Sequence, residues 1–287
     1  MRRVIVLTVL LALAAPVHAE AAEGGSVWTA WFDDPLVAIV LAMIVAAYVT
    51  GLVRTRRAAR YGREVGTVRV AAFFAGVAVA AIALLSPLDP LGERLFSVHM
   101  FQHLLLIIGS APLLAFSDAH VVLAESFPAS LRHRMARLPA LAAVAEWWQR
   151  PSAGWAAGAG FVVAIWFWHV PALHDWATED RLAHAAEHLS VLATATLFWR
   201  VVVTSGRRRV SPGAAALMVS LAGLSGALLS ALIMFAPQPI CRAYVNNPIE
   251  DQVLAGLLMC IPASFVYLGS TIWALWRLIG GEQSHAG

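Results

Sequence analysis

Seven long runs of apolar residues constrain this chain more than any other feature of its sequence. They cover residues 36–53, 70–86, 95–116, 153–171, 183–204, 213–236 and 252–277. A transmembrane helix needs about 20 consecutive, mostly apolar residues, and the runs approach or exceed that length. The composition agrees, because 60% of the residues are hydrophobic and 13% are charged, whereas soluble domains are about 25% charged. The runs therefore predict an all-α polytopic membrane protein with seven transmembrane helices.

The arginines predict how these helices are oriented. The chain has no lysine, and most arginines of its loops lie in the connections after the first, third and fifth runs: Arg54, Arg56, Arg57, Arg60, Arg63, Arg69, Arg132, Arg134, Arg137, Arg150, Arg207, Arg208 and Arg209. By the positive-inside rule these connections are cytoplasmic. This predicts an outer N-terminus, a cytoplasmic C-terminus and a multi-pass protein of the bacterial plasma (inner) membrane. Because the arginines form no single patch, we expect a lipid bilayer and no nucleic acid as partner.

Residues 1–19 have the pattern of a secretory signal peptide. Arg2 and Arg3 precede an apolar stretch that is too short to cross a membrane, and Val17, His18 and Ala19 resemble a cleavage site. We therefore expect a cleaved signal peptide followed by a single helical membrane domain over residues 20–287.

The segment 117–152 is not expected to cross the membrane, although it separates two apolar runs. Arginines interrupt it, and Pro128 and Pro139 punctuate it. We predict surface helices here, anchored at the membrane interface by Trp147 and Trp148.

Histidines gather at the predicted outer ends of the third, fourth and fifth runs. They are His99, His103, His169, His174, His184 and His188. Within each of the pairs His99/His103 and His184/His188 the residues are four apart, so each pair shares one face of a helix. Polar groups inside membranes are costly and usually face a partner. We therefore predict a metal site, with five of these residues as ligands: His99, His103, His169, His184 and His188.

Other side chains near the same membrane depth are candidates for auxiliary roles. Met100, Met259 and Cys260 carry soft donors, which favour Cu(I), and imidazole also suits copper. Asp251 is expected to orient a ligand histidine, and Glu187 to do the same or to relay protons. His174 follows Pro171 and is expected in a loop at the lipid–water interface, as an auxiliary residue. The favoured ion is Cu(I), with zinc or haem as alternatives.

Two other functions fit parts of this pattern. The letters H-x-x-E-H in AHAAEHL (183–189) match a zinc hydrolase signature, with His184 and His188 on zinc and Glu187 as base. A haem-binding electron carrier would use a histidine from each of two helices, but such carriers place histidines near both membrane faces. Copper binding needs no catalytic residue, so the leading interpretation is not an enzyme.

Five blocks of the sequence resemble a known family. They are HMFQHLLL at 99–106, APLL at 111–114, WHVPALHDWA at 168–177, HAAEHLSVLATATLFW at 184–199 and DQVLAGLLM at 251–259. Together they resemble the CtaG cytochrome c oxidase assembly family of the caa-type oxidase systems, over roughly residues 36–277. The resemblance implies a membrane assembly factor that delivers copper at the outer face, with oxidase subunits and a periplasmic copper donor as partners. It implies roles for these matching positions: His99, His103, His169, His184, His188, Asp251 and Gln252.

Overall fold

The computed structural model describes residues 31, 35–58, 65–206 and 210–283. The predicted signal peptide (1–19) lies outside these residues. The described chain is helical without a strand, so the all-α prediction is confirmed. Its elements are α2 (Pro35–Ala58), α3 (Thr67–Leu85), α4 (Leu88–Gly92), α5 (Phe96–Leu104), η3 (Leu105–Ser110), α6 (Ala111–Ser117), α7 (Ala119–Glu125), α8 (Ala129–Ala136), α9 (Pro139–Trp147), α10 (Pro151–Trp168), α11 (Pro171–Glu179), α12 (Arg181–Thr204), α13 (Pro212–Met234), η4 (Arg242–Tyr244) and α14 (Ile249–Gln283).

Six of the described helical stretches are long and apolar enough to cross a membrane, and up to seven if the bent pair α10–α11 counts as one span. The chain is thus a multi-pass membrane protein. The predicted run 153–171 does not continue as a straight helix to its end. Instead α10 ends at Trp168, and the chain turns by 75° into α11. Pro171 explains this break, because proline disfavours helical backbone in the residue before it, and Val170 is indeed extended.

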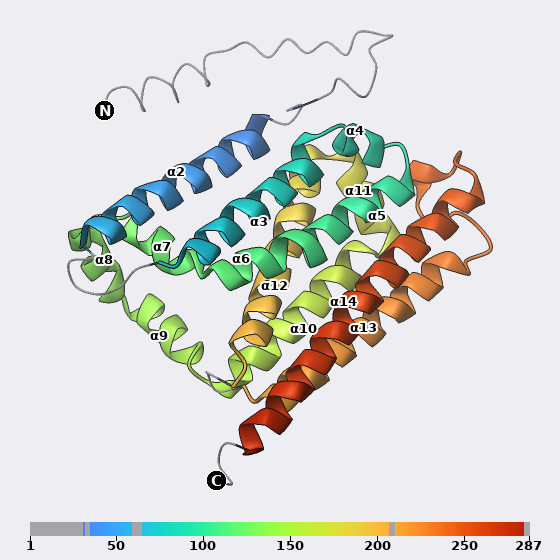
Figure 1. The fold of residues 1–287 in the computed structure, drawn as a ribbon. Helices are drawn as coiled ribbons and strands as arrows, with labels where there is room; N and C mark the ends of the chain where they lie inside the picture. The colour runs from blue at the N-terminus through green and yellow to red at the C-terminus, as the bar shows by residue number, and fades with distance from the viewer. Residues whose placement is uncertain (1–30, 32–34, 59–64, 207–209, 284–287) are drawn as a thin grey trace.

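The long helices run side by side between two ends of different chemistry (Figure 1). At one end, here called the histidine end, lie α4, α11 and the connection 235–248. At the other, here called the arginine end, lie α7, α8, α9 and the C-terminal part of α14. The described parts of the arginine-rich segments, at the end of α2, at the start of α3 and over α8 and α9, lie at this end. The orientation relative to a membrane stays a prediction.

The core joins α5, α6 and the helices from α10 onward into one packed unit. α13 packs along most of α14, and glycine makes this approach close. A Cβ on Gly256 would meet Cβ of Met234 and the carbonyl of Ser230 at 2.9 Å. A smaller cluster fastens α2 to α3 and α7, where Tyr48 stacks on Phe73 with ring centroids 3.6 Å apart.

A π-helical turn, η3, interrupts the third span between α5 and α6 and was not expected from the sequence. Such turns leave backbone groups free and are frequent at functional sites. Here the Trp199 indole on α12 donates to the Ile107 carbonyl at 2.7 Å, and Ser110 donates to the Gly76 carbonyl at 2.8 Å. The turn therefore ties α5 and α6 to both neighbouring helices, directly after the two histidines of α5.

The segment 117–152 forms three short helices, α7 to α9, as the sequence predicted. Nothing on α8 or α9 is buried. The Trp147 and Trp148 rings contact each other edge to face at the end of α9, with centroids 5.1 Å apart. None of these three helices is long and apolar enough to cross a membrane, so the prediction of a non-spanning segment is confirmed, while its place at the membrane interface stays a prediction.

Candidate metal centre

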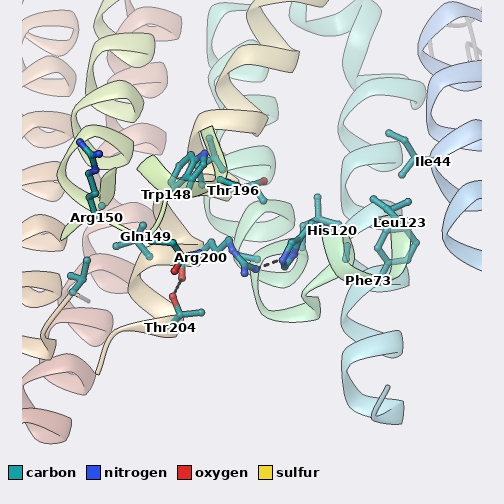
Figure 2. A pocket seen from close by; sticks show the side chains of 18 residues that line it. Ile44, Phe73, His120, Leu123, Trp148, Gln149, Arg150, Thr196, Arg200 and Thr204 are labelled. Atoms are coloured by element: carbon teal, nitrogen blue, oxygen red, sulfur yellow. Dashed lines mark hydrogen bonds between the residues drawn. The ribbon is translucent and has the colours of Figure 1, made fainter. Parts of the chain in front are cut away.

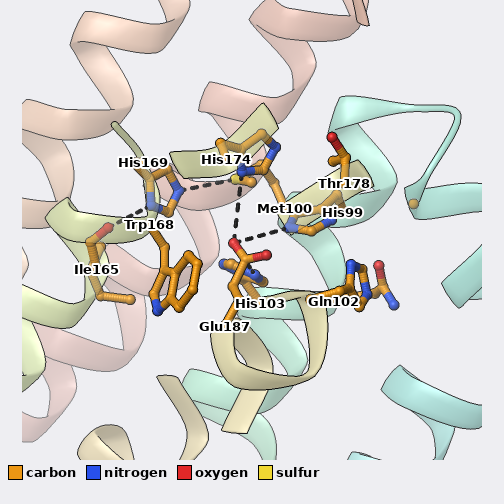
Figure 3. A network of polar contacts seen from close by, with 12 residues as sticks. His99, Met100, Gln102, His103, Ile165, Trp168, His169, His174, Thr178 and Glu187 are labelled. Atoms are coloured by element: carbon orange, nitrogen blue, oxygen red, sulfur yellow. Dashed lines mark hydrogen bonds and ion pairs between the residues drawn. The ribbon is translucent and has the colours of Figure 1, made fainter. Parts of the chain in front are cut away.

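Four elements bring six histidines together at the histidine end. The two histidines of α5 face His174 of α11 and His169 at the end of α10 (Figure 3). Helical spacing points the two histidines of α12 to the same interior, where their rings contact those of α5. The ring centroids lie 4.4 Å apart for His184 and His188, 5.2 Å for His103 and His188, and 5.5 Å for His99 and His188. Residues from three predicted spans therefore form one cluster.

Three overlapping groups in this cluster have the geometry to hold an ion. In each group one atom from every residue lies within 4.8 Å of the others. The groups are His99, His103 and His188; Asp89, His184 and His188; and His99, His174 and Glu187. His99 and His188 each belong to two of them, so they connect the three sets of donors. Four of the five predicted ligands, His99, His103, His184 and His188, take part.

Glu187 lies at the centre of the cluster and is fully buried. Its Oε1 is 3.4 Å from Nε2 of His103, 3.5 Å from Nε2 of His99 and 3.7 Å from Nδ1 of His174 (Figure 3). These distances exceed those of good hydrogen bonds. The sequence assigned Glu187 an auxiliary role, whereas the structure makes its carboxylate a donor in one of the three groups.

Most of the nitrogen and oxygen atoms that could ligate an ion in this cluster lack a hydrogen-bond partner. Among the described residues, both ring nitrogens of His99, His103 and His174, both carboxylate oxygens of Glu187, and Nε2 of His184 and of His188 are buried and unsatisfied. Native proteins satisfy the great majority of buried polar atoms, because each orphan costs about 1–3 kcal/mol. These unsatisfied nitrogen and oxygen atoms face one another, which is an arrangement suited to a bound cation.

Asp89 belongs to the cluster, and sequence reasoning missed it. Its Oδ1 lies 3.5 Å from Nε2 of His184, and the Gln102 amide donates to it at 3.0 Å. Burial alone would raise the pKa of this carboxyl, but the contact with His184 and the nearby His188 outweigh burial and lower the pKa. The available signal was its place in the short connection 87–95, at the same end as the histidines.

Soft donors line one side of the cluster. The Met100 sulfur lies 3.3 Å from Nε2 of His169 (Figure 3). The Nδ1 atom of the same ring forms a hydrogen bond with the Ile165 carbonyl at 2.7 Å. Met259 lines a small hollow of about 50 Å³ together with Met100 and His169. Cys260 is half-buried and is not among the residues that line this hollow. The His169 ring lies beside that of His103, with centroids 5.8 Å apart, but His169, unlike the other four predicted ligands, takes part in none of the three groups.

The auxiliary residue His174 does not lie where the sequence predicted it. His174 was expected in an interfacial loop, but it sits on α11 with 1% of its surface exposed. The bend after α10 turns α11 back over the cluster and buries this ring. His174 therefore faces His99, with ring centroids 4.8 Å apart, as part of a donor group.

Asp251 does not orient a histidine. Its carboxylate accepts hydrogen bonds from the backbone N–H groups of Phe96 and Ser97, at 2.8 and 3.2 Å, and from the Asn247 amide at 3.1 Å. It therefore caps the first turn of α5, where backbone N–H groups have no partner within the helix. Gln252 accepts from the Ile240 N–H at 2.8 Å and secures the connection 235–248. Both residues support the helices that carry the cluster.

The connection 235–248 closes the histidine end with Cys241 and Tyr244, both buried. Tyr244 donates to the Gly92 carbonyl at 2.7 Å, and burial raises the pKa of its hydroxyl. Burial, together with the carboxylates of Asp175 and Glu187, raises the pKa of the Cys241 thiol to about 12. Cys241 lines a hollow of about 270 Å³ with His169 and His174. The sequence had singled out Cys260 and had given Cys241 no role.

Comparison with known proteins identifies the family. The family model described as cytochrome c oxidase caa3 assembly factor (Caa3_CtaG) matches residues 46–280. Searches of the curated proteins and of the solved structures found no significant match. The matched residues include α5, α10, α11, α12 and most of α14, and they contain the whole histidine cluster with Asp89 and Glu187. The chain belongs to the cytochrome c oxidase caa3 assembly factor family, as the five sequence blocks had indicated.

Proposed function

We propose that this cytochrome c oxidase assembly factor binds Cu(I) in its histidine cluster and passes the ion to an oxidase subunit. One observation carries the proposal, namely the convergence of buried imidazole nitrogens and carboxylate oxygens that lack any hydrogen-bond partner among the described residues. Histidine nitrogens suit copper, and the Met100 thioether beside His169 shifts the preference toward Cu(I).

The group formed by His99, His103 and His188 is the most suitable holding site. All three rings are buried, and together they offer three neutral donors. A cation in such a place is costly unless a negative charge compensates it. Glu187 supplies that charge, because its carboxylate lies 3.4 and 3.5 Å from two of the three rings. The ion and the carboxylate then neutralise each other in the low-dielectric interior.

The overlap of the donor groups suits exchange of the ion. Asp89 and His184 keep 18% and 16% of their side-chain surface exposed, so their group is the more accessible one. It shares His188 with the buried holding site. An ion can therefore change partners one at a time without losing all its ligands. With this end outside the cytoplasm, as the arginines predict, a periplasmic donor loads the site and an oxidase subunit receives the ion.

A zinc-dependent hydrolase is the second candidate. Asp89, His184 and His188 form a two-histidine, one-carboxylate group that is partly exposed, as catalytic zinc sites require. Glu187, however, contacts the rings of His99, His103 and His174, which belong to the other groups. It is poorly placed to act as base on an ion held by His184 and His188, so the structure favours the copper proposal.

Haem is a weaker alternative. The imidazole rings pack against each other with centroids about 4.4 to 5.8 Å apart, which leaves no space between them for a macrocycle. The two hollows that adjoin the cluster measure about 50 and 270 Å³. Pockets for larger organic ligands measure about 300–1,000 Å³.

The decisive experiment combines metal analysis with a binding titration. Protein purified under reducing conditions should bind Cu(I) in competition with a chromophoric chelator, and His99→Ala with His103→Ala should abolish the tight binding. The matched control is His133→Ala, because His133 lies on α8 at the arginine end. A double variant that binds Cu(I) as tightly as the parent and still supports oxidase activity rules out the proposal. Stoichiometric zinc and lipid turnover that is lost in Glu187→Gln would replace it with the hydrolase.

A further inference from the structure

A large hollow at the arginine end lies far from the histidine cluster and has no role in metal binding. Its volume is about 710 Å³, which is within the range of about 300–1,000 Å³ typical of ligand pockets. It lies between the unit formed by α2, α3 and α7 and the unit formed by α10 and α12, and the end of α9 lies beside it (Figure 2). α6 packs against both α3 and α12, and its Leu114 and Ala115 line the hollow between the two units.

The walls of this hollow change character from one side to the other. Ile44, Phe73 and Leu123 form an apolar wall on the side of α2 and α3, as Figure 2 shows. Arg150, directly before α10, lies on the opposite side, and Arg200, on α12, lies between Arg150 and the apolar wall. An apolar compartment that ends at cationic groups suits a molecule with a hydrocarbon chain and an acidic head.

The charges around the hollow leave a positive excess. Arg200 donates to Asp118 at 2.7 Å, but the same carboxylate also pairs with Arg69. One carboxylate therefore pairs with two guanidinium groups and neutralises only one of their two positive charges. Arg150 pairs with Glu146 at 3.3 Å, and both side chains are well exposed, so this pair is weak and Arg150 can turn to another anion. No acidic side chain is among the residues that line the described hollow.

We propose that this hollow binds an anionic phospholipid, with an acyl chain against Ile44, Phe73 and Leu123 and the phosphate at Arg150 and Arg200. Basic pockets between transmembrane helices at the cytoplasmic side are a recurrent form of anionic lipid site. Guanidinium groups match phosphate geometry with paired hydrogen bonds. A small soluble anion would leave the apolar wall empty, whereas a lipid occupies both parts. The bound lipid then fills the space that α6 leaves between the two helical units.

The proposal is tested by native mass spectrometry of the purified full chain in detergent. The probes are phosphatidylglycerol and phosphatidylcholine with identical acyl chains, so that the two lipids differ only in the head group, which is anionic in the first and zwitterionic in the second. The parent should retain phosphatidylglycerol about fivefold more strongly, and Arg150→Gln should remove most of that preference. Ala145→Phe, which places a ring in the hollow from α9, should lower retention of both lipids.

Two controls separate this site from general lipid adhesion. Arg137→Gln removes an exposed charge at the same end, and Ala143→Phe adds a ring to the same helix; neither residue lines the hollow. Both should behave as the parent, and thermal unfolding should verify that all variants are folded. Equal retention of the two lipids by the parent overturns the proposal. So does an equal effect of Arg150→Gln and Arg137→Gln.

Discussion

The two ends of the helical bundle treat polar groups in opposite ways. At the histidine end, imidazoles and carboxylates are buried together, and many of their atoms have no hydrogen-bond partner. At the arginine end, one carboxylate, that of Asp118, pairs with both Arg69 and Arg200, which leaves an excess of positive charge. The empty space there is an apolar hollow rather than a set of unsatisfied donors. Unsatisfied polar atoms indicate an ion, whereas a hollow bordered by a cationic excess indicates an amphiphile.

The two ends also differ in how exact a geometry their proposed ligands require. A metal site needs several donor atoms within a few ångströms, and the histidine end provides this by packing four helices around Glu187. A lipid site tolerates looser geometry, because apolar contact and long-range charge attraction do most of the binding. The two ends should therefore respond to different ligands and to different mutations.

The largest expected effect tests whether the histidine end is closed to water. A thiol with a pKa raised from 9.0 to about 12 holds about a thousandfold less thiolate at neutral pH. In a Cys260→Ser background, iodoacetamide should alkylate Cys241 of the folded protein about a thousandfold more slowly than in the denatured chain. The folded-state rate should keep rising with pH beyond pH 10, since deprotonation occurs only near the raised pKa. Mass spectrometry follows the reaction, and equal rates would contradict the burial of this end.

The next effect tests which end binds metal. His188 belongs to two of the three donor groups, so His188→Ala should lower Cu(I) affinity roughly 100-fold or more. It should also abolish the rise in melting temperature that a ligand of the native state produces. His133→Ala, at the arginine end, should change neither quantity. A similar loss in both variants would mean that copper binds nonspecifically to histidines.

A smaller effect isolates the charge of the cluster. Glu187→Gln keeps the size of the buried side chain and removes the negative charge that compensates the ion. Cu(I) affinity should fall about 10- to 100-fold in the chelator competition. Glu125→Gln is the matched control, because Glu125 pairs with Arg132 at the arginine end. An unchanged affinity in Glu187→Gln would show that the carboxylate is not part of the holding site.

The smallest effect separates helix capping from metal orientation. Asp251→Ala removes the cap of α5 and should cost about 0.5–2 kcal/mol of stability, seen as a lower melting temperature in detergent. Glu250→Ala, one residue earlier and exposed, should leave the melting temperature unchanged. Ligand orientation would instead produce a large loss of Cu(I) affinity without a loss of stability.

Much of this architecture could be predicted, because membrane insertion makes local signals strong. Runs of apolar residues located the long helices, and the arginines and prolines of 117–152 indicated a segment that does not span. Helical spacing alone showed that His99 and His103 share a face, as do His184 and His188. The prediction was less accurate where the backbone is irregular. The apolar run 153–171 gave no sign of the bend before Pro171. Because of that, His174 was predicted in a loop, whereas it is buried in the core.

The same limit explains the errors at Asp89 and Asp251. Both are acidic residues near the ends of apolar runs. The residues around them in the sequence do not distinguish a metal ligand from a helix cap. Asp89 lies beside His184, which is distant in sequence, and Asp251 lies at the start of α5, which is still more distant from it in sequence. Contacts of this kind depend on how helices from different parts of the chain pack.

The sequence by itself determined that this chain is a polytopic helical membrane protein, which residues fall on common helix faces, and which family it resembles. The first two properties follow from the length of the apolar runs and from local spacing, and the resemblance rests on the five matching sequence blocks. Only the tertiary structure decided that Glu187 lies between three histidines, that Asp89 and His174 complete the donor groups, and that a hollow separates the helical units at the arginine end. The physical reason is that donor distances and cavities arise from the packing angles of whole helices, which no short stretch of sequence encodes.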